Sequence, residues 1–537
     1  MSIVINALSH IYPDGEVLFQ NLNLSITKRK KVSLVGHNGV GKSTLLQIIA
    51  GRIPVAHGEV LLSEKPYYVP QHLGQYNDCS AAEALGISEK ITALRAVLQG
   101  NVSAENLEIL NDDWDIEERA KSALSYWKLQ NLNLEHPLNL MSGGEKTKLF
   151  LAGIQIHSPH VILMDEPSNH LDAESRSILY DFISKSKEII LVVSHDRALL
   201  NLLDMTLELT HSAIETYGGN YDFYKVQKEA KLHDLESQIE EQEKILRQTK
   251  QRAREIAEQQ QKREVRGKSQ TGKKALPRII AGGLQGKAEQ SSAKLKDSQE
   301  EKMSVINDNL SQAREQLQKQ QLLRIDLKKS SLHKDKILVD IKSVNHIYGN
   351  APLWKQPLSL QIRSGERIQI EGNNGSGKTT LLKIIMEKIA PSEGSVVRAD
   401  FRYLYLDQEY SMLNAECTLF EQVQQFNERH LLEHELKTLL HCYQFSRDSW
   451  DRKCGLLSGG EKMKLLFCCI MVSDNAPDML ILDEPTNNLD LYSQEILTEA
   501  VKHFTGTVLL ISHDQYFVEA VEVGRKLRIE KEGHILK

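Results

Sequence analysis

The segment Gly36-His37-Asn38-Gly39-Val40-Gly41-Lys42-Ser43 lies between an apolar run at Val32–Val35 and a helix-like stretch at Thr44–Ala50. This order of strand, glycine-rich loop and helix is the one that a phosphate-binding P-loop requires. Glycines let successive backbone N–H groups turn toward one anion, the lysine reaches the outer phosphates, and the serine hydroxyl can ligate Mg²⁺. The segment therefore predicts a phosphate site in an α/β domain.

Length and composition indicate the number of domains and the class of protein that contains this site. The 537 residues are 41% apolar and 26% charged, as in ordinary globular proteins, and exceed what one hydrophobic core holds, so two or more domains are expected. The six cysteines lack metal-type spacing, which suits a reducing compartment. The first residues do not resemble a signal peptide, and no apolar run approaches the roughly 18 residues of a membrane span. We expect a soluble, cytoplasmic protein.

The P-loop belongs to an internal repeat. A second loop, Gly372–Thr379, restates the first, so that Lys378 corresponds to Lys42. Two further segments recur in the same order: Ser142–Lys146 as Ser458–Lys462, and Met164–Pro167 as Leu482–Pro485. The chain is a tandem duplication.

Each half also contains an apolar run that ends in two carboxylates. Val161–Met164 is followed by Asp165 and Glu166, and Met479–Leu482 is followed by the equivalent pair. Four consecutive apolar residues predict a buried parallel strand, and ligands of such sheets bind at the carboxyl ends of the strands. The carboxylates are therefore expected beside the bound phosphates.

Together these motifs resemble those of the ATP-binding cassette (ABC) ATPases, over nearly all of both halves. The signature segments Met141–Glu145 and Leu457–Glu461 separate that family from other P-loop proteins, and a Ser-His-Asp segment ends each series at His195-Asp196 and His513-Asp514. The resemblance implies an α/β fold with two tandem P-loop ABC nucleotide-binding domains. It also implies ATP and Mg²⁺ as cofactors, and hydrolysis of ATP to ADP and phosphate.

The resemblance assigns roles to the matching residues. Glu166 and Glu484 would act as general bases, and His195 and His513 as switch histidines at the terminal phosphate. The expected Mg²⁺ ligands are Ser43, Gln71, Asp165, Thr379, Gln408 and Asp483. The expected ATP contacts are Tyr12, Gly36, Asn38, Gly39, Gly41, Lys42, Ser43, Thr44, Ser142, Gly143 and Gly144 in the first half, and Tyr348, Gly372, Asn374, Gly375, Gly377, Lys378, Thr379, Thr380, Ser458, Gly459 and Gly460 in the second.

In this family two cassettes pack head to tail, so each site is composite. Ser458–Gly460 would close over ATP held by Lys42, and Ser142–Gly144 over ATP held by Lys378. Neither half lacks the lysine, the glutamate or the signature glycines. Two competent sites and a monomer with intramolecular cassette pairing are expected.

Three features resemble the ABC-F branch, whose members have no membrane domain and act on ribosomes. Glu166–Asp172 and Glu484–Asp490 resemble its EPTNHLD motif, with Ser168 and Asn488 as departures. Tyr217–Tyr224 resembles the motif that leads into the interdomain linker. The third feature is the linker, and the expected domains are a first cassette at 1–224, a linker at 225–335 and a second cassette at 336–537.

The linker sequence predicts an antiparallel coiled-coil hairpin. Apolar residues recur at alternating three- and four-residue steps: Leu232, Leu235, Ile239, Leu246, Ala253 and Ile256, then Ile306, Leu310, Ala313 and Leu317 on the return. Its tip, near 262–287, is basic and surrounds the apolar segment Ala275–Leu284. A basic rim suits phosphates, so rRNA is the expected partner, with P-site tRNA as a second candidate. The tip has no aromatic residue for base stacking.

The layout favours one subtype and leaves others open. The first cassette has no room for a large inserted arm and no basic tail follows the second, a layout that resembles the bacterial ABC-F proteins that protect ribosomes from antibiotics. Some housekeeping ABC-F translation factors share it. Two other classes remain as alternatives: the ATPase subunit of a separate membrane transporter, and a DNA-repair ABC ATPase, although repair types carry zinc clusters or longer coiled coils.

Overall fold

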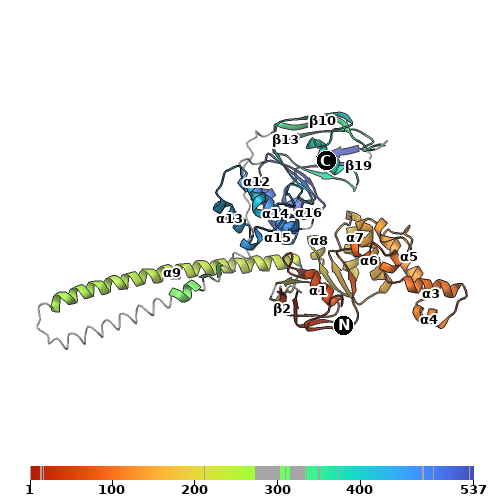
Figure 1. Cartoon of the computed structure of the whole chain (residues 1–537), viewed down its shortest axis with the longest axis horizontal. Coiled ribbons are helices and arrows are strands. Elements are labelled where there is room, and N and C mark those ends of the chain that lie inside the picture. Colours follow the sequence, from red (N-terminus) through yellow and green to blue (C-terminus); the bar gives the residue numbers. More distant parts are fainter. Residues whose placement is uncertain are drawn as a thin grey trace. The chain divides into compact units, whose positions relative to one another are not determined.

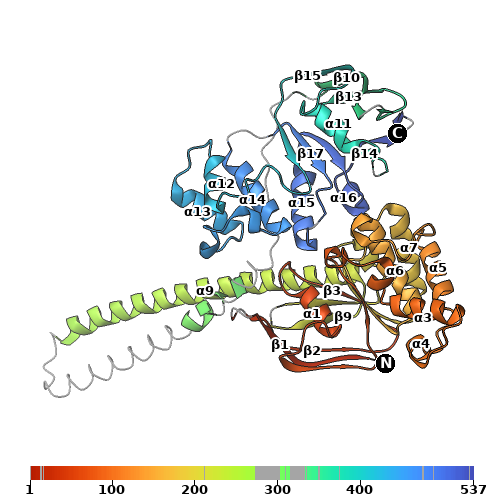
Figure 2. The same cartoon turned by 45° about the vertical axis from the view of Figure 1, so that its right-hand side comes forward.

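The computed structural model describes residues 2–12, 15, 17–210, 212–271, 303–308, 310–311, 313–314, 333, 335–348, 351–373, 375–473, 477–487, 489–530 and 533–536. The chain forms two compact units. One contains both cassettes, Met1–Asp222 with Leu323–Lys537, and the other is the linker, Phe223–Leu322. The elements of both are drawn in Figures 1 and 2.

The first cassette is built on a six-stranded sheet of order β5-β6-β7-β3-β8-β9. Its strands are β3 (Lys31–Val35), β5 (Tyr67–Val69), β6 (Val161–Asp165), β7 (Ile189–Val193), β8 (Met205–Leu209) and β9 (Ile214–Tyr217). All neighbours are parallel except β8 and β9. Every residue of β6 and β7 is buried, as their unbroken apolar sequences predict.

A small antiparallel sheet and a set of helices complete this cassette. The sheet, of order β2-β1-β4, contains β1 (Ile3–Ile11), β2 (Val17–Ile26) and β4 (His57–Leu62). The helices are α1 (Lys42–Ile49), α2 (Ala81–Ala84), α3 (Ser88–Leu98), α4 (Ala104–Leu110), α5 (Ile116–Tyr126), α6 (Gly143–His157), α7 (Ala173–Lys185) and α8 (Arg197–Leu200), with 3₁₀ turns η1 (Gly74–Tyr76) and η2 (Leu138–Leu140).

The second cassette repeats this architecture, as the duplicated sequence predicts. Its main sheet has the order β16-β17-β18-β14-β19-β20 and its small sheet the order β13-β10-β15, beside the two-stranded pair β11-β12. The strands are β10 (Ile337–Asn345), β11 (Ile347–Tyr348), β12 (Ala351–Pro352), β13 (Leu358–Arg363), β14 (Arg367–Glu371), β15 (Glu393–Arg398), β16 (Tyr403–Leu406), β17 (Met479–Asp483), β18 (Thr507–Ile511), β19 (Arg525–Glu530) and β20 (Gly533–Leu536). The helices are α11 (Lys378–Ile385), α12 (Leu419–Gln425), α13 (Glu433–Cys442), α14 (Gly459–Val472), α15 (Leu491–His503) and α16 (Gln515–Ala520), with 3₁₀ turns η3 (Arg447–Ser449) and η4 (Cys454–Leu456).

The linker begins with α9 (Tyr221–Thr271), a single helix of 51 residues. The described pieces of the return, 303–308, 310–311 and 313–314, are helical. Ile239 and Leu310 are buried, and Arg314 Nη2 lies 2.6 Å from Glu243 Oε1, so the two segments lie side by side. The coiled coil itself stays a prediction, and the part of the basic tip beyond Thr271 lies outside the described residues.

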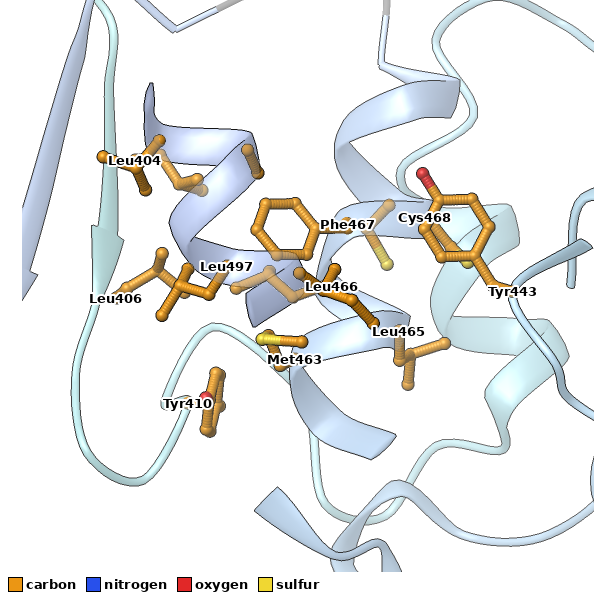
Figure 3. Packing of buried hydrophobic residues seen from close by; sticks show 14 of the residues in the cluster. Leu404, Leu406, Tyr410, Tyr443, Met463, Leu465, Leu466, Phe467, Cys468 and Leu497 are labelled. Carbon is orange, nitrogen blue, oxygen red and sulfur yellow. The ribbon is translucent and has the colours of Figure 1, made fainter. Parts of the chain in front are cut away.

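Two apolar clusters hold the second cassette on either side of its main sheet. Ile481 and Leu509 point to the cluster that contains α11. Their neighbours Leu480 and Leu510 point to the other cluster, with α14 and α15. Figure 3 shows the Phe467 ring of α14 at the centre of this second cluster, beside Leu466 and Leu497.

We predict that Phe467→Ala destabilises the protein by about 3–5 kcal/mol, because the ring is almost fully buried and its removal leaves a cavity. Urea unfolding followed by circular dichroism measures this. Leu456→Ala is the matched control, since that side chain is 66% exposed and its loss should cost little. Equal effects of both substitutions would show that α14 does not pack as described.

Candidate functional site

The two P-loops have the backbone conformation that their glycines predict. Gly41 and Gly377 cap α1 and α11 with φ of 99° and 93°, in the left-handed region that only glycine adopts without cost. A Cβ on Gly41 would come within 2.7 Å of a Leu18 side-chain carbon, and one on Gly377 within 2.6 Å of Leu353. Glycine is therefore required at both positions by conformation and by space.

Each P-loop lysine is held over its own loop. Lys42 Nζ donates to the carbonyl oxygens of Gly36 at 2.8 Å and His37 at 3.0 Å. Lys378 Nζ makes the equivalent bonds to Gly372 at 2.7 Å and Asn373 at 3.1 Å. Burial lowers the pKa of both lysines, against nearby carboxylates that raise it. The ammonium groups are thus placed for the outer phosphates of a nucleotide.

The last residue of β6 and of β17 forms a polar cluster with the start of the P-loop helix. Thr379 Oγ1 donates to Asp483 Oδ2 at 3.0 Å, and Tyr405 hydroxyl lies 3.4 Å from the same oxygen. In the first cassette Tyr68 hydroxyl lies 3.2 Å from Asp165 Oδ2. Burial raises the pKa of Asp165, whereas its bonds to Ser43 and Tyr68 lower it. The two tyrosine contacts were not predicted from the sequence. Its only signal for them is that aromatic residues precede Gln71 and Gln408.

This cluster fits a magnesium ion. Asp165 Oδ1 is buried and has no hydrogen-bond partner among the described residues, so one ligand position is already directed into the site. Carboxylate and hydroxyl oxygens are the hard ligands that Mg²⁺ prefers, and protein sites supply only one or two of them beside the substrate's phosphates. The residues that the sequence predicts as ligands are thus chemically suitable.

The glutamates that follow have a strained backbone. Glu166 and Glu484 have φ of 52° and 50°, a conformation that is rare for residues other than glycine. The N–H of Glu166 donates to Val193 O at 2.8 Å, and that of Glu484 to Ile511 O at 2.8 Å. Such conformations cost about 1–3 kcal/mol and persist only where the surroundings fix them. Here the neighbouring strand holds each glutamate turned out of the sheet.

A histidine faces each glutamate. The ring nitrogen Nε2 of His195 lies 3.3 Å from Glu166 Oε1, but the two are not aligned as a hydrogen bond. The backbone N–H of His195 donates to the other carboxylate oxygen, Glu166 Oε2, at 3.3 Å. Glu484 and His513 repeat both contacts at 3.4 Å. Burial, then the charge of Asp165, raises the pKa of Glu166 to about 8, and burial raises that of Glu484 to about 7. Burial and the P-loop lysines lower the pKa of both histidines. Burial therefore favours the uncharged form of both the histidine and the glutamate in each pair.

One cavity, of about 660 Å³, contains part of the first predicted site. It is lined by Asn38, Gln71, Glu166 and His195 of the first cassette, together with Ser458 and Gly459 of the second. The structure thus brings one signature segment to the opposite cassette's site. Nearby, the Asn38 N–H donates to Asp490 Oδ2 at 2.9 Å across the two cassettes.

A second cavity, of about 770 Å³, contains most of the other predicted site. Predicted residues on its wall are Tyr348, Gly375, Gly377, Lys378, Thr379, Thr380, Gln408, Asp483, Glu484 and His513. From the first cassette come Asn169–Asp172 and Arg176. Ser142, Gly143 and Gly144 do not line this cavity. Gly144 packs on its own cassette instead, where a Cβ would come within 2.7 Å of His170 O.

The remaining predicted contacts differ between the halves. Both tyrosines are exposed, Tyr12 by 38% and Tyr348 by 55%, and each packs edge-on against a histidine. Tyr348 lines the second cavity, where its hydroxyl lies 3.4 Å from Thr380 Oγ1, whereas Tyr12 does not line the first. Asn374 lies outside the described residues. The sequence reading missed Arg176, since nothing in a single helix sequence shows that it faces the opposite cassette's site.

Comparisons with known proteins identify the family of the chain. The family described as "ABC transporter" matches residues 19–169 and 355–487. The chain is 29% identical to "ABC transporter F family member 5" of Arabidopsis thaliana, over 96% of this chain and 73% of that one. It is 28% identical to "Ribosome protection protein VmlR" of Bacillus subtilis (strain 168), over 96% of this chain and 85% of that one. Among solved structures, an archaeal ribosome recycling factor, aABCE1, shares the fold with a TM-score of 0.59 and 18% identity, over 98% of this chain and 89% of that one.

The fold and the duplicated site therefore define an ABC protein, and the chain belongs to the ABC transporter family as a tandem-cassette ATPase that hydrolyses ATP. Within that family it is an ABC-F member. In the part of the chain that the structure describes, no helix has the length and apolar character needed to cross a membrane.

The raised glutamate pKa values give a prediction for stability. Below the ordinary Glu value of about 4.5 both folded and unfolded states are protonated; above it the unfolded state ionises first, so stability falls as pH rises toward about 8. Glu166→Gln removes this loss, and the nucleotide-free variant should be more stable than wild type by about 1–3 kcal/mol at pH 8 and equal at pH 4.5.

Thermal unfolding at both pH values measures the difference. Glu89→Gln, an exposed glutamate on α3, is the matched control and should change nothing. A Glu166→Gln variant no more stable than wild type at pH 8 would contradict the burial of an ionisable carboxyl at this site.

Proposed function

We propose that this protein is an ATP-driven, ribosome-binding ABC-F factor of the cytoplasm, which acts on translating or stalled ribosomes through its linker and protects them from antibiotics. The observation that carries the proposal is the similarity to a ribosome protection protein over 96% of this chain, a span that includes the linker as well as both cassettes. The basic linker tip adds independent support, because a cluster of lysines and arginines suits rRNA phosphates.

We assign the chemistry to the two strand-end glutamates. Glu166 and Glu484 each orient the attacking water and accept its proton, which requires the carboxylate form. The facing histidines, His195 and His513, donate to the terminal phosphate through the nitrogen that now lies beside the glutamate. The P-loop lysines and the loop N–H groups bind the outer phosphates.

Mg²⁺ would be held by Ser43 and Asp165 in the first site and by Thr379 and Asp483 in the second, with Gln71 and Gln408 as further oxygen ligands. Bound by these residues, the ion would supply positive charge that offsets the negative charge developing in phosphoryl transfer. The tyrosine hydroxyls at Asp165 and Asp483 keep one carboxylate oxygen fixed, so that the other is free for the metal.

Closing of the cassettes on ATP couples this chemistry to the ribosome. Ser458 and Gly459 already line the first cavity, and Ser142–Gly144 would reach the second when the cassettes close. Contacts that depend on the terminal phosphate hold the closed form, and their loss on hydrolysis lets it open, the logic of nucleotide switches in general.

We predict that Glu166→Gln with Glu484→Gln traps the closed protein on ribosomes in ATP. The amide keeps the shape of the side chain but cannot accept the proton, so turnover should fall by about 10²–10⁴-fold while binding survives. Sedimentation through a sucrose cushion measures ribosome binding, and phosphate release measures turnover. A double variant that leaves ribosomes in ATP as readily as wild type would contradict the switch.

Deletion of residues 267–286 tests the linker tip. If about five basic residues of the tip contact RNA phosphates, doubling the salt concentration should weaken ribosome binding by about tenfold in the intact protein, and the deletion should flatten this dependence. Nucleotide binding should be unchanged. Ala at Leu276, Ile279 and Ile280 is the matched control for charge, and should keep the salt dependence while losing the effect on translation.

Growth assays separate the resistance function from a housekeeping role. The deleted protein should no longer restore drug tolerance in a sensitive host. A growth defect without drug, relieved by the intact chain, would instead identify a general translation factor. Full drug tolerance with the tip removed would show that the linker is only a tether.

A further inference from the structure

Arg176 of the first cassette lies on the wall of the second cassette's site. It follows the motif Glu166–Asp172 by four residues, in the first turns of α7, and it lines the same cavity as Lys378, Glu484 and His513. Its Nε is buried and has no hydrogen-bond partner among the described residues. An arginine that is partly buried without a full set of partners retains donors for a ligand, since the guanidinium carries five N–H groups.

The charge of Arg176 acts on the second site. It lowers the pKa of Glu484 and of His513, behind the larger effects of burial. The groups that act on Glu166 are instead Asp165, Lys42, His195 and Asp196, all from the first cassette. Arg176 also borders the first cavity and acts on Tyr180 of its own helix. Of the two glutamate–histidine pairs, however, its charge acts on the pair of the opposite cassette.

The helix that carries Arg176 is capped at its start, and the neighbouring helix α8 contacts the second cassette. Asp172 caps α7 by accepting from the Ser175 N–H at 2.8 Å. Close by, Arg197 of α8 lies 3.5 Å from Glu495 of the second cassette, with both side chains largely buried. The start of α7 is thus fixed within its own cassette, and the neighbouring α8 is joined to the second cassette, by contacts that do not involve Arg176 itself.

The duplicated position also lines a cavity at the opposite cassette's site, but it has an uncharged residue. Asp490 caps α15 as Asp172 caps α7, and the residue that corresponds to Arg176 is Gln494. Gln494 is buried and its Nε2 donates to Thr486 O and Leu489 O, both at 3.4 Å, within its own cassette. Only the second site therefore receives a positive charge from across the cassette interface at this position.

We propose that Arg176 binds the terminal phosphate of the nucleotide held by Lys378, in trans, and that this contact makes the second site distinguish ATP from ADP more strongly than the first site does. The inference rests on the proposed function of Lys378 as a P-loop lysine. An arginine brought to the terminal phosphate from a second body stabilises both the bound triphosphate and the charge that develops on its transfer. Loss of that phosphate breaks the contact, so hydrolysis in the second site removes one interaction that joins it to the first cassette.

The test uses the full chain with Lys42→Ala, which leaves one functional P-loop. Affinities for the fluorescent analogues mant-AMP-PNP and mant-ADP are measured with Mg²⁺ by titration. Arg176→Ala should weaken mant-AMP-PNP by about 10- to 100-fold, the loss of a charge-assisted bond, and change mant-ADP by less than about threefold. Arg176→Lys, which keeps the charge, should recover most of the loss.

Three results overturn the proposal: an unchanged ratio of the two affinities in Arg176→Ala, an equal loss for both nucleotides, or a lowered thermal stability that Arg176→Lys does not restore. Gln494→Ala is the matched control. It is measured in the Lys378→Ala background, so that only the first site binds, and it should leave the ratio of the mant-AMP-PNP and mant-ADP affinities at that site unchanged. If adding Lys378→Ala to the Lys42→Ala variant does not abolish nucleotide binding, then Lys378 is not a P-loop lysine. That result would contradict the proposed function and not the role of Arg176.

Discussion

The structure depends on a constraint at the carboxyl end of one strand in each cassette. β6 and β17 are buried on both faces, so their side chains cannot carry charge until the strand ends. At that point the chain presents an aspartate to the P-loop helix and turns through a left-handed glutamate, which the adjacent strand fixes by a backbone hydrogen bond. The glutamate pKa, its facing histidine and its distance from the P-loop all follow from this turn.

Much of this could be predicted from the sequence. The P-loops, the buried strands and the paired carboxylates are local patterns whose spacing decides their structure, and the duplication supplies an internal check. The resemblance to ABC ATPases then assigned a role to each matching residue. The family and the ATPase activity were confirmed by the comparisons, while the roles of individual residues stay predictions.

The remainder depends on contacts between segments that are distant in sequence. The tyrosine hydroxyls at Asp165 and Asp483 come from a neighbouring strand, and their partners are visible only once the sheet order is known. Arg176 and Gln494 occupy equivalent helix positions and both border a cavity at the opposite cassette's site, but Arg176 carries a positive charge, whereas Gln494 is neutral and donates to its own backbone. The sequence reading treated the halves as equal because their motifs are equal; the asymmetry lies in residues outside the motifs.

The most direct test of the account is whether the terminal phosphate controls ribosome binding by the unmodified protein. Purified ribosomes are sedimented with the wild-type chain in saturating AMP-PNP or in ADP, each with Mg²⁺, and the bound fraction is measured. The account predicts that the protein sediments with ribosomes in AMP-PNP and stays in the supernatant in ADP. Equal sedimentation in both nucleotides, or none in either, would contradict it.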